Sequence, residues 1–129
     1  ALTTATETLL TYNTERWDNN TMHSTVTATG RLTVQTAGTY IVSLNVGFAS
    51  NATGIRWAAI LINDTSYLGR GEHPIVSSSS STVINPGVIY QAVATDYFHS
   101  HAYQTSGGNL NVEATLNYSP EFMAHWMGN

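Results

Sequence analysis

The two histidines of His99-Ser100-His101 have the spacing best suited to chemistry in this chain. On a β-strand, residues two positions apart point to the same side, so both imidazoles could bind one metal ion. Tyr97 and Tyr103 would lie on the same face. The plainer interpretation is that polar residues simply occupy the outward side of a strand. We therefore assign no metal and no cofactor, and keep His99 and His101 as the candidate metal ligands.

Other catalytic patterns are absent or incomplete. The chain has no cysteine and no lysine, which excludes thiolate nucleophiles, Cys-ligated zinc, Schiff-base chemistry and a P-loop. No Gly-x-Ser-x-Gly motif occurs. Glu72-His73 lacks the second histidine of a zinc-protease helix, and Pro74 follows it. The acidic residues show no spacing that favours a catalytic carboxylate pair. The sequence predicts that the protein is not an enzyme.

Charge and hydropathy exclude further classes. The formal net charge is −4 and the isoelectric point is near 5.6, so the chain lacks the basic surface that binds nucleic acid. No apolar run approaches the roughly 18 residues of a transmembrane helix, and no basic-then-apolar leader is present. We expect a soluble protein, with a removed leader or a longer parent chain left open.

The elements that must position these residues are strands. Charged residues make up only 9% of the chain, and threonine, serine and asparagine supply the polarity, as is typical of strand surfaces and turns. Apolar residues alternate with polar ones over 40–48 and 110–118, which predicts two strands with one buried face each. Residues 55–62 are apolar on both faces and predict a strand covered on both sides. Further strands are expected at 31–34, 83–93, 97–104 and 122–126.

Turn-forming residues separate these strands, and no helical stretch lies between them. The turns are expected at 51–54, 63–64, 85–87 and 106–109. This spacing predicts one all-β domain over residues 1–129, a two-sheet antiparallel sandwich of Greek-key or jelly-roll type. Its expected core is Tyr40, Val42, Leu44, Val46, Phe48, Leu110, Val112, Leu116 and Phe122.

The tryptophans and the Asn-x-Ser/Thr sequons raise the alternative of a glycan-binding or glycosylated protein. Trp57 lies inside an apolar run, so we expect it in the core or at an interface. Trp17 and Trp126 are not placed by any pattern and could stack on sugar rings. Sequons at Asn19, Asn51, Asn63 and Asn117 are close to the number expected by chance in this composition.

Short motifs follow one another in a distinctive order along most of the chain. They are Glu15-Arg16-Trp17-Asp18, Met22-His23, Arg31-Leu32-Thr33-Val34, Ala37-Gly38-Thr39-Tyr40-Ile41-Val42, Asn51-Ala52-Thr53-Gly54-Ile55-Arg56, Ile60-Leu61-Ile62-Asn63, Asp96-Tyr97-Phe98, Tyr103-Gln104-Thr105-Ser106-Gly107-Gly108 and Tyr118-Ser119-Pro120-Glu121-Phe122. In this order the chain resembles the C1q/TNF-like jelly-roll superfamily, especially the C1q-like modules of bacteriophage structural proteins.

Two positions depart from that family's pattern. Thr95 precedes Asp96 where the family usually has glycine, and Asn63-Asp64 stands where it usually has Asn-Gly. The Asn63-Asp64 pair can still form a type I′ turn.

The resemblance implies a homotrimer with strands packed around a three-fold axis. It places residues 97–103 in an axis-lining strand, with Phe98 and Ala102 directed to the core and the alternate residues directed to neighbouring subunits. The candidates for the trimer interface are accordingly Trp57, Tyr97, His99, His101 and Tyr103.

The resemblance also implies a function, namely a non-enzymatic phage virion surface protein. Such a protein would be a capsid decoration, head-fibre or fibre-tip module that stabilises the particle, adheres to the host surface, or does both. Its expected partners are two further copies of the chain, a capsid or tail-fibre protein, and a host-surface glycan. Nucleic acid and membrane insertion are not expected. The alternative is a secreted C1q/TNF-like ligand or a glycan-binding module.

Overall fold

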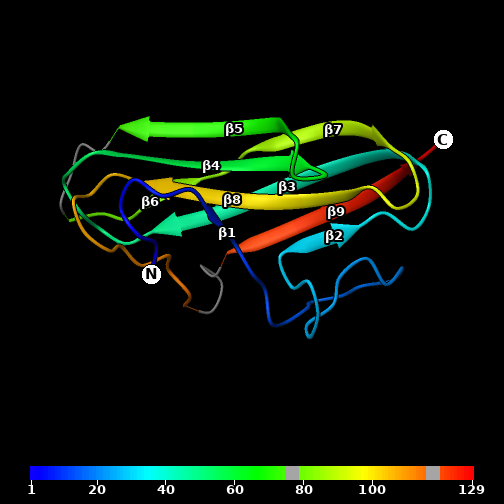
Figure 1. The fold of residues 1–129 in the computed structure, drawn as a ribbon, viewed down its shortest axis with the longest axis horizontal. Helices are drawn as coiled ribbons and strands as arrows, with labels where there is room; N and C mark the ends of the chain where they lie inside the picture. Colours follow the sequence, from blue (N-terminus) through cyan, green and yellow to red (C-terminus); the bar gives the residue numbers. More distant parts are fainter. Residues whose placement is uncertain (75–78, 116–119) are drawn as a thin grey trace.

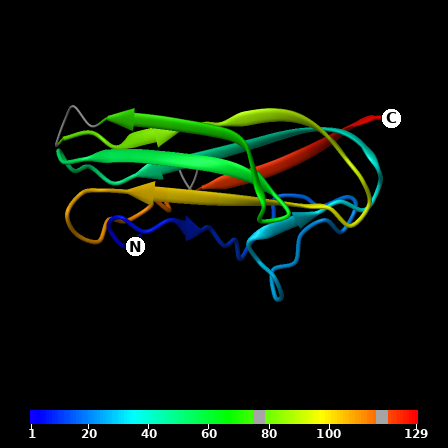
Figure 2. The ribbon, with the colours of Figure 1, turned by 45° about the horizontal axis from the view of Figure 1, so that its top comes forward.

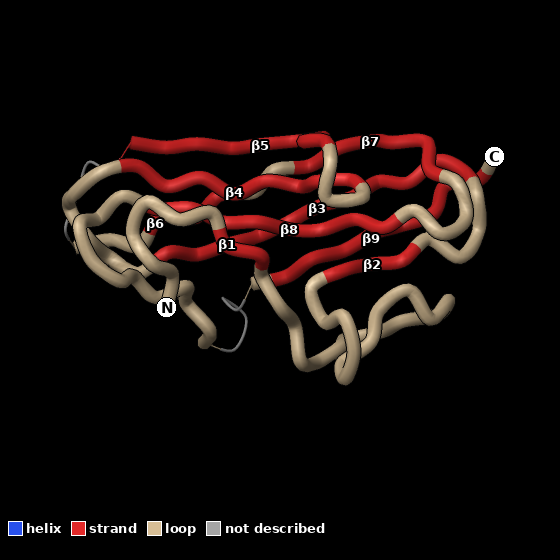
Figure 3. Tube along the Cα trace, in the orientation of Figure 1, coloured by secondary structure: helices blue, strands red, loops and turns tan. Residues whose placement is uncertain are grey.

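The fold was analysed in a computed structural model of the chain, which describes residues 1–74, 79–115 and 120–129. These residues contain strands and loops but no helix (Figure 3), as the composition predicted. The strands are β1 (Thr8–Leu9), β2 (Arg31–Thr33), β3 (Gly38–Phe48), β4 (Ile55–Ile62), β5 (Ser66–Pro74), β6 (Thr82–Ile84), β7 (Gly87–Ala92), β8 (Tyr97–Gln104) and β9 (Glu121–Gly128). No helix long and apolar enough to cross a membrane occurs in this part of the chain.

The strands form two antiparallel sheets that run along the same long axis (Figures 1 and 2). In the five-stranded sheet, β8 lies at the centre, with β1 and β2 on one side and β4 followed by β5 on the other. In the four-stranded sheet, β3 pairs with β9 on one side and with β6 and β7 on the other. The prediction of an all-β, two-sheet antiparallel protein is confirmed.

The core lies between the two sheets, and strand β3 shows why the alternating pattern identified it. Tyr40, Val42, Leu44, Val46 and Phe48 are all buried, as predicted. One apolar cluster joins them to residues of the opposite sheet, including Ile60, Phe98 and Ala102. Of the other expected core residues, Leu110 is buried, Val112 and Phe122 are partly buried, and Leu116 lies outside the described residues.

Strand β4 is buried on both faces, as its composition predicted, and both covers come from the same chain. Its inward side joins the main core. On its outward side, Trp57, Ala59 and Leu61 form a second cluster with Ile55 and Tyr103. Trp57 is only 6% exposed, because side chains of the neighbouring strands lie over it.

The predicted strand over 110–118 is wrong for its described part. Residues 110–115 form no strand, although they contain two isolated bridges, Leu110 to Leu2 and Val112 to Phe48. These partners belong to different parts of the fold, so the segment passes from one neighbour to the other and cannot pair along either. The apolar alternation therefore indicates which side chains face inward, but it does not indicate continuous backbone pairing with one neighbouring strand. The remainder of the prediction, residues 116–119, lies outside the described residues.

Turn chemistry follows the sequence closely at the Asn63-Asp64 pair, but not at Thr95. Asn63 and Asp64 both have positive φ, 52° and 56°, and the Thr65 amide donates to the Ile62 carbonyl at 3.0 Å. These values match the type I′ turn that was predicted there. Thr95 adopts a φ of 79°, a left-handed conformation that a β-branched residue rarely takes.

Candidate functional site

Strand β8 divides its side chains between the core and the outer face of the five-stranded sheet. Phe98, Ser100, Ala102 and Gln104 are fully buried on the inner side. Tyr97, His99, His101 and Tyr103 therefore share the outer face, which confirms the predicted alternation. Because β8 is paired on both sides, the positions of these side chains are fixed by the sheet.

The predicted candidates form two adjoining groups on this face. His99 and His101 stack with ring centroids 6.2 Å apart, and the Tyr97 ring lies 4.9 Å from His99. Trp57 and Tyr103 stack at 5.1 Å with nearly parallel rings. The structure thus brings all five candidates onto one face, in two clusters side by side.

Arg70 and Tyr67, both of β5, complete the second cluster. The Arg70 guanidinium lies 4.6 Å from the centre of the Trp57 ring, and Tyr67 meets that ring edge-on at 6.4 Å. These contacts account for the small exposed area of Trp57. Cation–π and aromatic contacts of this kind contribute about 0.5–1.5 kcal/mol each.

Two carboxylates join the histidine pair, and sequence patterns did not identify either. The Asp64 carboxylate forms an ion pair with Nδ1 of His99, and its Oδ1 lies 3.8 Å from Nε2 of His101. Glu7, next to β1, places Oε1 2.7 Å from Nδ1 of His101. Asp64 was assigned only to the turn after β4. That turn reaches β8 because Ile62 at the end of β4 pairs with Phe98.

Glu7 is itself held by a second contact. The Tyr67 hydroxyl donates to both carboxylate oxygens of Glu7, at 2.7 Å each. This hydrogen bond is the main cause that raises the pKa of Tyr67, and burial raises it further. Glu7 is thus positioned to orient the His101 ring, since a carboxylate that accepts from Nδ1 leaves Nε2 directed at Asp64.

The hydroxyl between the two histidines does not take part in this cluster. Ser100 is fully buried on the inner side of β8, and its Oγ lies 2.7 Å from the hydroxyl of Tyr12. Burial raises the pKa of Tyr12 well above its ordinary value. Ser100 therefore cannot pair with His99 or His101 as a nucleophile and base, because its side chain points to the opposite face.

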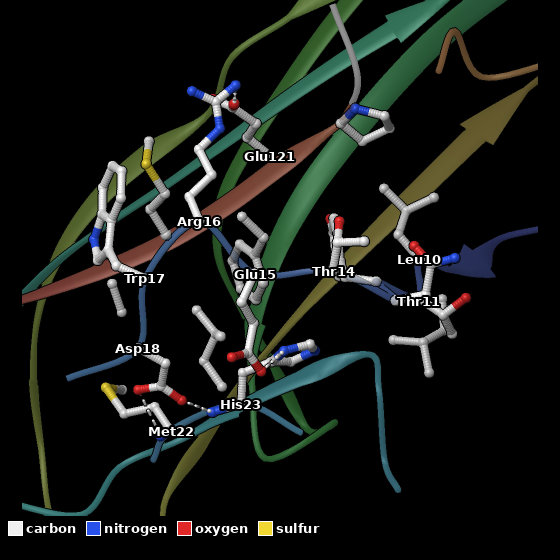
Figure 4. A pocket seen from close by; sticks show the side chains of 18 of the residues that line it. Leu10, Thr11, Thr14, Glu15, Arg16, Trp17, Asp18, Met22, His23 and Glu121 are labelled. Carbon is white, nitrogen blue, oxygen red and sulfur yellow. Dashed lines mark hydrogen bonds and ion pairs between the residues drawn. The ribbon is translucent and has the colours of Figure 1, made fainter. Parts of the chain in front are cut away.

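A groove of about 830 Å³ lies between the segment that follows β1 and strand β9. Figure 4 shows Arg16 reaching across to Glu121 of β9, with which it forms an ion pair. Trp17 and Trp126 both line the groove, and Trp17 is 68% exposed. These are the two tryptophans that the sequence patterns left unplaced.

The wall of this groove is organised by Asp18. Its carboxylate accepts hydrogen bonds from the backbone amides of Asn20, Met22 and His23, at 2.9–3.1 Å. Partial burial by itself would raise the pKa of Asp18, but these hydrogen bonds together with the nearby His23 lower it. The dashed lines from Asp18 in Figure 4 mark two of them. The Asp18 and Met22-His23 motifs thus build a loop rather than a reactive centre.

Comparison with known proteins adds no family assignment. No protein-family model matches the chain, and no curated protein matches it significantly.

Proposed function

We propose that this chain is a C1q/TNF-like jelly-roll module that acts as a non-enzymatic homotrimer on the surface of a virion. The strand connections support the jelly-roll assignment. Three connections stay within one sheet, namely β1 to β2, β4 to β5 and β6 to β7, whereas the chain changes sheets after β2, β3, β5, β7 and β8. Repeated crossing between two antiparallel sheets is the arrangement of Greek keys and jelly rolls.

The observation that carries the trimer proposal is the outer face of the four-stranded sheet. Ile41 of β3 pairs directly with Ile89 of β7, and His125 of β9 pairs with Ile41 on the other side. Ile41, Ile89 and Met123 are exposed, and Ile89 is 66% exposed. We call the surface formed by these four residues the Ile41–Ile89 face.

The Ile41–Ile89 face suits contact with further copies of the same chain. None of its four residues is Asp, Glu or Arg, and Glu121, two positions before Met123 on the same side of β9, is paired with Arg16. Each copy carries a net charge of −4. Copies would therefore repel one another least when these faces meet. Burial of apolar side chains would supply the attraction, at about 25 cal/mol per Å².

This proposal moves the subunit contact away from the residues that the resemblance suggested. Trp57 and His99 are already buried within one chain, so they have little surface left to lose to a neighbour. Tyr97, His101 and Tyr103 lie on the same five-stranded sheet, on the side of the molecule opposite the Ile41–Ile89 face. Substitution on each face separates the two possible interfaces.

On a virion, the trimer would serve as a capsid decoration, head-fibre or fibre-tip module. Stabilising the particle needs only a rigid β-sandwich and a docking surface. Adhesion to the host would use the groove with Trp17 and Trp126, because exposed tryptophans stack well on sugar rings. The same groove favours a glycan-binding module as the second candidate function.

Labelling of purified virus particles tests the proposed function. An antibody raised against the folded protein, with gold detection in electron microscopy, should mark regular positions on the capsid or fibre. Matched particles from a virus in which the gene is deleted serve as the control. Absence of the protein from intact particles, together with its secretion by the producing cell, would contradict the virion assignment.

A glycan array with the Trp17→Ala variant tests the adhesion role. Binding by the wild-type chain that Trp17→Ala loses would support it. Equal binding by both proteins would place any glycan contact outside the groove.

A further inference from the structure

The geometry points to a divalent transition-metal site on the five-stranded sheet, with Asp64, His99 and His101 as its protein ligands. One nitrogen or oxygen atom of each side chain lies within 4.8 Å of the others. Two imidazoles and a carboxylate are a donor set that suits zinc and its neighbours in the first transition series. The calcium and magnesium ions prefer sites made of oxygen atoms alone. This inference does not depend on the proposed trimer.

The clearest indication comes from Nε2 of His101. This atom is buried and has no hydrogen-bond partner among the described residues. The nearest acidic oxygen is Oδ1 of Asp64, at 3.8 Å. Since Glu7 accepts from Nδ1 of the same ring, a neutral His101 directs the lone pair of Nε2 toward Asp64. Two electron-pair donors that face each other in this way are satisfied by a cation between them.

The support around these ligands is what a bound metal requires. Metal-ligating histidines usually donate their second ring nitrogen to a carboxylate, which fixes the ring and increases its basicity. Glu7 supplies that carboxylate to His101 and is held in turn by Tyr67. His99 and His101 lie on the central strand of the sheet, so the two rings are fixed relative to each other.

The distances allow a metal after a small movement of one ligand. In a tetrahedral site with zinc–nitrogen distances of about 2.0–2.1 Å, neighbouring ligand atoms lie roughly 3.3 Å apart. The 3.8 Å separation of Asp64 and His101 is about half an ångström longer. The same oxygen lies closer to Nδ1 of His99 than two ligands of one metal do, so it must also move away from that nitrogen. Side-chain rotation allows both changes, because Asp64 lies in an exposed turn and its side chain is 54% exposed.

A metal at this position would join three segments that are far apart in the sequence. Asp64 belongs to the β4–β5 turn and the histidines to β8, while Glu7 links the site to the start of β1. With three protein ligands, a fourth position remains open to water or to an anionic group of a partner. The expected consequence is a cross-link that stabilises the outer face of the sheet.

Zinc titration of the EDTA-treated full chain tests this site. In isothermal titration calorimetry with ZnCl₂, we expect saturable binding of one ion per chain and a rise in the melting temperature. MgCl₂ at the same concentration should produce neither effect. Asp64→Asn keeps a residue that tolerates positive φ and should weaken zinc binding more than 100-fold. Glu7→Gln should weaken it by about 10–100-fold, as expected for a residue that orients a ligand.

The His73→Gln variant is the matched control, because His73 is an exposed histidine at the end of β5. It should bind zinc as tightly as the wild-type chain. The inference is overturned if zinc gives no saturable heat, in which case a proton on His101 Nε2 satisfies the same geometry. It is also overturned if Asp64→Asn and His101→Gln both retain wild-type affinity, or if one ion binds per three chains.

Discussion

Replacement of Ile89 by aspartate tests the proposed subunit contact at its most exposed apolar residue. Full burial of an isoleucine side chain contributes about 1.5–3 kcal/mol. Ile89 is 66% exposed in the single chain, so burying the remaining surface in a trimer contributes roughly 1–2 kcal/mol per subunit. Three subunits give about 3–6 kcal/mol per trimer, before the cost of burying a carboxylate is added.

This energy corresponds to a change of about 10²–10⁴-fold in the dissociation constant of the trimer, at 1.4 kcal/mol for each factor of ten. We therefore expect Ile89→Asp to sediment as a folded monomer at micromolar concentration. Its far-ultraviolet circular dichroism should remain that of the wild-type chain, because Ile89 faces away from the core.

Val26→Asp provides the control for adding a charge to an exposed apolar residue. Val26 is 84% exposed and lies in a loop between β1 and β2, so this variant should remain a trimer. The reasoning would be refuted by an Ile89→Asp protein that sediments with the wild-type trimer. It would be refuted equally by loss of the trimer in both variants.

Three further predictions concern the stability of the fold, each measured by thermal unfolding. Gly54→Ala should lower the melting temperature more than Gly107→Ala. Both glycines have positive φ, but a Cβ at Gly54 would clash with the Thr105 carbonyl oxygen, whereas a Cβ at Gly107 would lie in open space. Equal losses would contradict this. Thr95→Gly should stabilise the fold by about 0.5–1 kcal/mol, since relief of roughly 1–2 kcal/mol of left-handed strain exceeds the added entropy of the unfolded chain; a lower melting temperature would contradict it. Asp18→Ala should destabilise the protein at pH 7 and lose that effect in acid. The pKa of Asp18 is lower in the folded protein than its ordinary value of 3.8, so the ionised carboxylate stabilises the fold above that value. This stabilisation disappears as the pH falls through the pKa of Asp18 in the folded protein. A constant difference between pH 7 and pH 3 would show that the Asp18 carboxylate does not act through its charge.

Sequence patterns predicted the features of this fold that depend only on residues near one another in the chain. Alternation along β3 predicted its buried face because side chains on a strand repeat every two residues. The apolar composition of β4 predicted burial on both sides. The Asn63-Asp64 pair predicted a type I′ turn because asparagine and aspartate tolerate positive φ. Each of these predictions needed no information about distant segments.

The failures arise where a residue's partner is far away in the sequence. Residues 110–115 alternate as a strand would, but their partners are Leu2 and Phe48, in different parts of the fold. Glu7 lies 94 positions from His101 in the sequence, and no spacing rule connects them. Asp64 was visible only as a turn residue, because its approach to His99 depends on the register between β4 and β8.

The N-terminal segment shows a third kind of limit. Its Glu15-Arg16-Trp17-Asp18 motif drew attention through resemblance, yet nothing in the residue types indicated its role. In the structure, Asp18 caps three backbone amides and Arg16 reaches Glu121. The motif therefore forms the wall of the groove that contains the exposed Trp17.

The solution mass of the wild-type chain tests the central claim most directly. Sedimentation equilibrium at neutral pH and micromolar concentration should give three times the chain mass of 13.9 kDa. A mass of one chain, unchanged as the concentration is raised tenfold, would contradict the trimer.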